Sequence, residues 1–294
     1  MILSVNKIHK SYGKEEVLKG ISFELNNPDI VALVGPNGSG KSTLLNIINN
    51  LLQADKGKIT ILGENNKNPE IFKKISFMQD NSVLYDYLTG YDHLQFIGDV
   101  QGISKKQILE TAERIGIAGY LNKKTGNYSL GMKQHLLLAM AIINHPKLLI
   151  LDEPLNGLDP TSAIKVRELL LQLAEQGTAI LLSSHNLAEI DRVTTNILFL
   201  KNGVLIQEGL SAHKQVWYEI KVMDAERAEL VLREAKITTN FKGSRLYICL
   251  KDETLNFIFE ILKLHNIVVL DIEKKILGTE ERYKKIFFSS DGVT

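Results

Sequence analysis

The fold is indicated most directly by one segment, Ile30-Val31-Ala32-Leu33-Val34-Gly35-Pro36-Asn37-Gly38-Ser39-Gly40-Lys41-Ser42-Thr43. Its unbroken apolar run predicts a buried parallel strand, and residues 42–52 carry apolar side chains at helical spacing. Between the two, residues 35–43 fit G-x-x-x-x-G-K-[ST], which we call the phosphate loop. Its glycines let backbone N–H groups point inward at a helix N-terminus, where they attract anions. We expect a nucleoside triphosphate here, with Lys41 at the β- and γ-phosphates and Ser42 holding Mg²⁺.

A second motif, Leu148-Leu149-Ile150-Leu151-Asp152-Glu153-Pro154, places two carboxylates after an apolar strand. Ligands of open α/β sheets bind at this carboxyl end of the strands. Asp152 is expected to orient Mg²⁺ or a bound water, and Glu153 to polarise the water that attacks the γ-phosphate. Alone, such a string more often marks a solvated strand end. Together with the phosphate loop, it favours the catalytic interpretation.

Strands and helices alternate over residues 1–210, which predicts an α/β domain with a largely parallel sheet. Short strands within residues 1–27 add antiparallel structure, and helical patterns dominate from about residue 90 to residue 176, interrupted by a strand at 147–151. Residues 211–294 follow a β-α-β-β-α-β order with a closing helix at 279–288. This order predicts a small ferredoxin-like α+β module as a second domain.

Composition excludes several classes of protein. The net charge of +1 lacks the basic excess of a nucleic-acid binder, so no nucleic-acid partner is expected. Cys249 is the only cysteine, which rules out an intramolecular disulfide and fits a reducing cytoplasm. The N-terminus lacks the layout of a secretory signal. No apolar run reaches the roughly 18 residues of a spanning helix, so we do not expect this chain to form a pore.

Residues 1–210 contain several more motifs, which include Tyr12, Gln79 and His185 and occur in the order found in one family. With them the chain resembles the nucleotide-binding subunits of ATP-binding-cassette (ABC) transporters, a branch of the P-loop NTPases. In that family the residue matching Tyr12 stacks on adenine. The residue matching Gln79 touches Mg²⁺ and links the site to the membrane partner. The residue matching His185 contacts the γ-phosphate. The resemblance implies ATP hydrolysis with ATP and Mg²⁺ bound at these positions.

The segment Tyr128-Ser129-Leu130-Gly131-Met132-Lys133-Gln134 matches the family's signature loop, usually written LSGGQ. In the family this loop caps the γ-phosphate bound to another subunit, a role that would fall to Ser129, Leu130, Gly131 and Met132. Asp159 matches the loop that crosses between the two subunits. ATP would therefore join two nucleotide-binding subunits, as a homodimer or a heterodimer. Leu130, Met132 and His135 depart from the common pattern, and the run Ser129-Leu130-Gly131-Met132-Lys133-Gln134 resembles the variant of bacitracin-type drug and peptide exporters.

The resemblance also implies a separate transmembrane permease, with this chain at the cytoplasmic face of the cell membrane. The segment 81–102 contains Leu88-Thr89-Gly90-Tyr91-Asp92-His93-Leu94, which is similar to an exporter-type motif, and is expected to receive the permease. Expected cargoes are drugs, antimicrobial peptides or amphipathic peptide toxins of the phenol-soluble-modulin kind. The alternative is a non-transporting regulatory or immunity ATPase bound to a membrane protein. The tail module either strengthens subunit pairing or covers exposed sheet surface.

Overall fold

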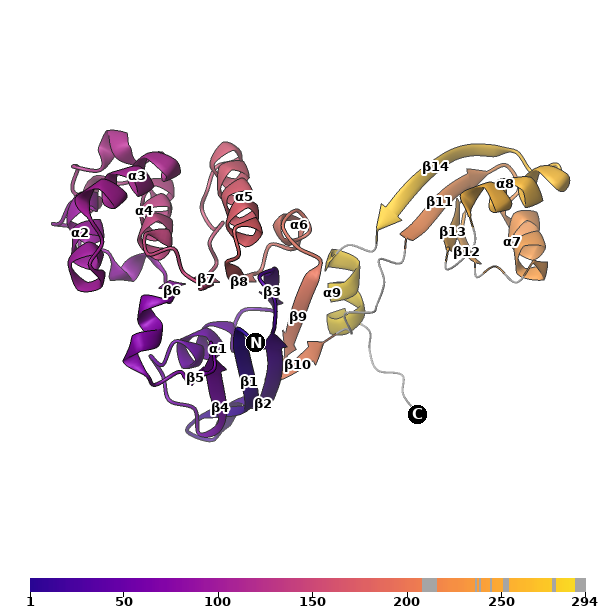
Figure 1. Cartoon of the computed structure of the whole chain (residues 1–294). Helices are drawn as coiled ribbons and strands as arrows, with labels where there is room; N and C mark the ends of the chain where they lie inside the picture. The colour runs from indigo at the N-terminus through magenta and orange to yellow at the C-terminus, as the bar shows by residue number, and fades with distance from the viewer. Residues whose placement is uncertain are drawn as a thin grey trace. The chain divides into compact units, whose positions relative to one another are not determined.

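The computed structural model describes residues 1–207, 216–235, 237, 239–243, 245–250, 254–276 and 279–288. The chain divides into two compact units, Met1–Gln207 and Glu208–Thr294, and each is described by itself (Figure 1). The boundary expected between residues 210 and 211 lies outside the described residues.

The first unit is built on a sheet with the strand order β10-β9-β3-β8-β7-β6. Its strands are β3 (Ile30–Val34), β6 (Ile75–Met78), β7 (Leu148–Asp152), β8 (Ala179–Ser184), β9 (Asn196–Lys201) and β10 (Val204–Gln207). All neighbours are parallel except the β9–β10 hairpin. A strand that is buried on both faces has apolar residues at consecutive positions, and this explains the sequences of β3, β7 and β8. The parallel arrangement brings the carboxyl ends of β3, β6, β7 and β8 to one edge.

A second, antiparallel sheet has the order β2-β1-β4-β5. Its strands are β1 (Leu3–Tyr12), β2 (Glu15–Leu25), β4 (Lys56–Ile61) and β5 (Glu64–Asn65). Helix α1 (Lys41–Ile48) shares one hydrophobic core with both sheets, through the fully buried Leu44 and Leu45 among others. The helix that follows the phosphate loop is thereby fixed in the core of the unit.

Helices α2 (Gly90–Gln101), α3 (Lys105–Ile115) and α4 (Leu130–Ile142) pack on one another (Figure 1). Capping boxes at Thr89 and Ser104 begin α2 and α3. Helix α4 is apolar around most of its circumference and largely buried. Helices α5 (Pro160–Glu175) and α6 (Leu187–Ile190) complete the unit. The predicted fold class, a mostly parallel sheet with antiparallel strands and a helical part, is confirmed.

The second unit contains β11 (Val216–Val222), α7 (Ala225–Glu234), β12 (Thr239–Lys242), β13 (Arg245–Cys249), α8 (Leu255–Leu264), β14 (Val269–Ile276) and α9 (Thr279–Phe288). Its antiparallel sheet has the order β12-β13-β11-β14, and its core joins Ile220 and Leu246 of the sheet with Leu232 and Leu262 of the helices. The β-α-β-β-α-β order is as the sequence predicted. Among the described residues, no helix has the length and apolarity needed to cross a membrane.

Candidate nucleotide site

The phosphate loop runs from the end of β3 to the start of α1. A Cβ on Gly35 would lie 2.5 Å from the carbonyl oxygen of Leu200, so a side chain there would displace the neighbouring strand. Gly40, at the N-cap of α1, has a φ of 102° and would bring a Cβ to 2.9 Å from Leu18 Cδ2. Both positions therefore require glycine. Pro36, Asn37 and Gly38 are exposed between them.

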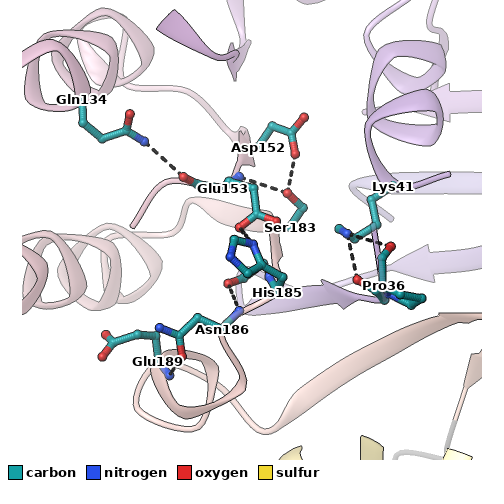
Figure 2. Close-up of polar contacts among 11 residues, drawn as sticks. Pro36, Lys41, Gln134, Asp152, Glu153, Ser183, His185, Asn186 and Glu189 are labelled. Atoms are coloured by element: carbon teal, nitrogen blue, oxygen red, sulfur yellow. Dashed lines mark hydrogen bonds and ion pairs between the residues drawn. The ribbon is translucent and has the colours of Figure 1, made fainter. Parts of the chain in front are cut away.

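The Lys41 side chain is folded back onto its own loop. Its Nζ donates to the carbonyl oxygens of Gly35 at 2.8 Å and of Pro36 at 3.3 Å (Figure 2). Burial lowers the pKa of Lys41, and the carboxylates of Glu153 and Asp152 oppose this shift. An anion in the loop would replace neutral acceptors with charged ones, which hold an ammonium more strongly.

The phosphate loop also contains a hydrogen-bond donor that is unpaired within the described residues. The hydroxyl of Ser39 is buried and has no hydrogen-bond partner among the described residues. Buried hydroxyls are nearly always hydrogen-bonded in native proteins. Exposed Ser42 and half-buried Thr43 lie in the first turn of α1, where backbone N–H groups are free of helical partners. The loop therefore suits a phosphate group in size and donors.

Strand register brings the other predicted groups to the same edge. On β7, Asp152 lies opposite Ser183 of β8, and Leu151 lies opposite Met78 of β6. Gln79 therefore follows its strand at the level of Asp152. His185 follows Ser184, the last residue of β8. The sequence predicted a strand end for Asp152, and the sheet places the strands that precede Gln79 and His185 on either side of it.

Glu153 occupies a left-handed backbone conformation, with a φ of 52°. For a non-glycine residue this conformation costs about 1–2 kcal/mol. Two side chains hold the residue in place: Ser183 Oγ accepts the Glu153 N–H at 3.0 Å, and Gln134 Nε2 donates to the Glu153 carbonyl at 3.1 Å (Figure 2). Ser183 Oγ in turn donates to Asp152 Oδ1 at 2.5 Å. One serine thus links the two carboxylate residues.

The Glu153 carboxylate contacts His185. Its Oε2 lies 2.9 Å from His185 Nδ1 and 3.3 Å from the His185 backbone nitrogen (Figure 2). Because a carboxylate only accepts, the Nδ1 atom carries the hydrogen in this pair. The imidazole therefore orients the carboxylate, and its Nε2 is left for another partner.

The predicted magnesium ligands are oxygen donors of the kind that Mg²⁺ prefers. Asp152 offers a half-buried carboxylate, Gln79 a half-buried amide oxygen and Ser42 an exposed hydroxyl. In the described parts of the chain, no group of three or more His, Cys, Asp or Glu residues is arranged to hold a metal. Mg²⁺ in nucleotide sites takes one or two carboxylates and completes its shell with phosphates and water. A set with the single carboxylate Asp152 fits that pattern.

Tyr12 ends β1 with 51% of its surface exposed, and Lys10 Nζ lies 5.8 Å from its ring centroid. The flat exposed ring is available for stacking. Asp159 caps α5 by accepting the backbone N–H groups of Thr161 and Ser162. Its carboxylate is therefore held at the helix end.

The signature loop begins α4. Ser129 is the N-cap, and its Oγ accepts the Met132 N–H at 3.2 Å. Leu130 is 51% exposed, whereas Gly131 and Met132 are half-buried. Among the described residues, no hydrogen bond joins Ser129 to the phosphate loop of the same chain. The structure therefore brings together all the predicted residues of the sheet edge, and the signature loop reaches that edge through Gln134 rather than through Ser129.

Sequence reasoning assigned no role to Ser183 or Gln134. Ser183 could have been found from strand register, because it is the β8 residue opposite Asp152. Gln134 is only 6% exposed on a helix that is otherwise largely apolar at its buried positions. A buried amide on such a helix signals a specific hydrogen bond.

Comparisons with known proteins agree with this geometry. A protein-family model described as ABC transporter matches residues 18–156. The lantibiotic transport ATP-binding protein SrtF of Streptococcus pyogenes is 35% identical over 207 residues, which cover 70% of this chain and 90% of SrtF. The bacitracin transport ATP-binding protein BcrA of Enterococcus faecalis is 33% identical over 248 residues, covering 82% and 80%.

Among solved structures, the dimeric structure of MJ0796, a bacterial ABC transporter cassette, superposes with a TM-score of 0.65 at 26% identity, covering 70% of this chain and 97% of that one. Another structure of MJ0796 is a dimeric post-hydrolysis state bound to ADP and phosphate. This chain belongs to the ATP-binding subunits of ABC transporters. It is an ATPase, and the predicted family is confirmed.

Proposed function

We propose that this chain dimerises on ATP and uses hydrolysis to drive a separate transmembrane permease that exports drugs, antimicrobial peptides or amphipathic peptide toxins. The observation that carries the proposal is the Glu153–His185 pair at the strand edge beside the phosphate loop. Export is supported by the departures at Leu130 and Met132 and by the similarity to SrtF and BcrA, which are named for lantibiotic and bacitracin transport.

During hydrolysis the protein positions the reacting groups and neutralises charge, and it forms no covalent bond to the phosphate. The Glu153 carboxylate orients the attacking water and accepts its proton, while His185 Nδ1–H holds the carboxylate in place. Lys41 leaves its loop carbonyls and binds phosphate oxygens. Asp152, Gln79 and Ser42 would hold Mg²⁺, which supplies charge neutralisation at the phosphates when bound.

The signature loop completes the site from another copy of the chain or from a related subunit. The start of α4 favours negative charge, because its first N–H groups and its dipole point toward the helix N-terminus. Ser129 and Gly131 would meet the γ-phosphate held by the partner's phosphate loop, and Asp159 would lie at the interface. Capping by Ser129 in the single chain keeps its hydroxyl at the tip of the helix.

Coupling to the permease runs through the segment after Gln79. Tyr85 and Tyr87 are 59% and 68% exposed, with ring centroids 5.8 Å apart. The Tyr85 backbone is fixed at both of its polar groups: its N–H donates to His93 Nε2 at 3.0 Å, and its carbonyl accepts from Thr125 Oγ1 at 2.8 Å. Exposed aromatic rings on a rigid backbone suit the docking of a permease helix. The chain would then work at the cytoplasmic face of the membrane.

The variant Glu153→Gln tests the proposal. It should lower ATP turnover about 10²–10⁴-fold and leave equilibrium ATP binding intact, because the amide keeps the shape but cannot accept the proton. Glu168→Gln, an exposed residue of α5, is the matched control and should keep wild-type turnover. Wild-type turnover by Glu153→Gln would show that another group acts as the base.

A further inference from the structure

Gln134 connects helix α4 to the backbone of Glu153. Its side chain is 6% exposed, and its Nε2 donates to the Glu153 carbonyl at 3.1 Å (Figure 2). The same carbonyl accepts the Asn156 N–H at 3.1 Å. The Gln134 amide therefore reaches a residue that has a left-handed backbone conformation and whose carboxylate contacts His185.

The backbone of Glu153 determines where its carboxylate lies. Ser183 holds the N–H and Gln134 holds the carbonyl, so the residue is fixed on both sides. A left-handed conformation persists only where surrounding contacts impose it. Without the Gln134 amide, the carbonyl keeps the Asn156 N–H of its own turn but loses its hydrogen bond to α4. The turn can then shift, and the carboxylate moves away from the position in which it meets His185 Nδ1.

The first turn of α4 also packs on the loop that follows Glu153. A Cβ on Gly157 would lie 2.2 Å from Leu130 Cδ2, which shows that the leucine side chain rests directly on this glycine. A Cβ on Gly131 would lie 3.8 Å from Leu158 Cδ2. Together with the Gln134 hydrogen bond, these contacts tie the start of α4 to residues 153–158.

We propose that Gln134 is a positioning residue that transmits the placement of the signature loop to Glu153 of the same subunit. The inference rests on the proposed function, in which the signature loop binds the triphosphate held by the partner and Glu153 acts on its own subunit's triphosphate. Binding at one site displaces α4, and the Gln134 amide carries that displacement to the Glu153 carbonyl. Occupancy of one site thereby controls hydrolysis at the other.

The first test is Gln134→Met in the full-length chain. Methionine has similar length and fills the same apolar surroundings, but it cannot donate a hydrogen bond. We expect kcat to fall about 10- to 100-fold, because misplacing a reacting group by about 1 Å has that effect. The KM for ATP should stay unchanged. Gln172→Met, on the exposed face of α5, should keep wild-type turnover. If the methionine variant does not fold, Gln134→Asn replaces it, since its shorter amide cannot reach the carbonyl.

A double-variant cycle separates positioning from a general structural role. In a Glu153→Gln background, adding Gln134→Met should leave the residual turnover unchanged, because no carboxylate remains to be misplaced. A further loss would show that Gln134 supports the fold rather than Glu153. Transmission between sites also predicts a Hill coefficient for ATP above one in the wild type that falls toward one in Gln134→Met.

Each outcome bears on one claim. Wild-type kcat in folded Gln134→Met, or an unchanged Hill coefficient, overturns the inference. If Glu153→Gln alone leaves turnover intact, the proposed function fails instead. A strong effect of Glu153→Gln with none of Gln134→Met contradicts only the role of Gln134.

Discussion

Replacing Gly157 by alanine tests the contact between the signature loop and the loop after Glu153. The backbone at Gly157 has a φ of +73°, and the new Cβ would lie 2.2 Å from Leu130 Cδ2 and 2.8 Å from Leu130 Cγ. The left-handed backbone costs an alanine about 1–2 kcal/mol. Overpacking by the new methyl group destabilises the protein by about a further 1–3 kcal/mol. We expect a value near the lower limit of this range, because the half-exposed Leu130 can move outward. We expect Gly157→Ala to lose about 2–4 kcal/mol of local stability in total.

Two further variants separate strain from overpacking. Gly102→Ala has nearly the same φ, +72°, and nothing within 4 Å of its Cβ, so it should lose only the strain. Adding Leu130→Ala to Gly157→Ala should restore about 1–2 kcal/mol and should not rescue Gly102→Ala.

Hydrogen exchange, followed by mass spectrometry over a urea series, measures each loss where it occurs: in α4 and α5 for Gly157→Ala, and in α2 and α3 for Gly102→Ala. Tryptophan fluorescence would not report on it, because the sole tryptophan, Trp217, lies in the second unit. Equal losses in Gly157→Ala and Gly102→Ala, or no rescue by Leu130→Ala, would refute the contact.

Two other predictions concern the same helical part. Burial lowers the pKa of His135, and the charge of Asp159 opposes this shift while that of Lys165 reinforces it. The imidazole therefore binds a proton at higher pH in the unfolded chain than in the folded one. The free energy of unfolding should fall as the pH drops below about 6.5. His135→Gln should flatten this acid dependence in urea titrations between pH 5 and 7.5, and an identical dependence would exclude His135 as its source. Thr125→Val removes a fully buried hydroxyl that donates to the Tyr85 carbonyl at 2.8 Å. It should lower stability by about 1–3 kcal/mol and speed hydrogen exchange around Tyr85, whereas unchanged exchange there would contradict a fixed tyrosine backbone.

Short sequence motifs predicted the parts of the site whose residues are close together in the chain. The phosphate loop needs glycine at Gly35 and Gly40, because a Cβ would lie 2.5 Å and 2.9 Å, respectively, from neighbouring atoms, so its sequence is diagnostic. Asp152 and Glu153 follow an apolar strand, and the parallel sheet then brings them beside Ser183. The parallel sheet was inferred from the alternation of strands and helices and not from any single residue, and its strand order was not predicted.

Contacts between distant segments were not predictable from the sequence. Gln134 and Glu153 lie 19 positions apart, and their hydrogen bond depends on how α4 packs against β6, the strand next to β7. The left-handed backbone of Glu153 is also imposed by tertiary contacts, since glutamate has no intrinsic preference for it. Leu130 departs from the common signature, and its contact with Gly157 gives a structural reason for the leucine. This contact can be recognised only when the positions of both loops are known.

In the proposed dimer, each catalytic site combines the phosphate loop of one subunit with the signature loop of another. Lys41→Ala and Ser129→Arg, each inactive alone, separate the two halves. Mixing the two variants should restore part of the ATP turnover, because a mixed pair contains one intact site, formed by the phosphate loop of the Ser129→Arg chain and the signature loop of the Lys41→Ala chain, while its second site stays empty. If the mixture stays as inactive as its components while the two chains are shown to pair, the site is not shared between subunits.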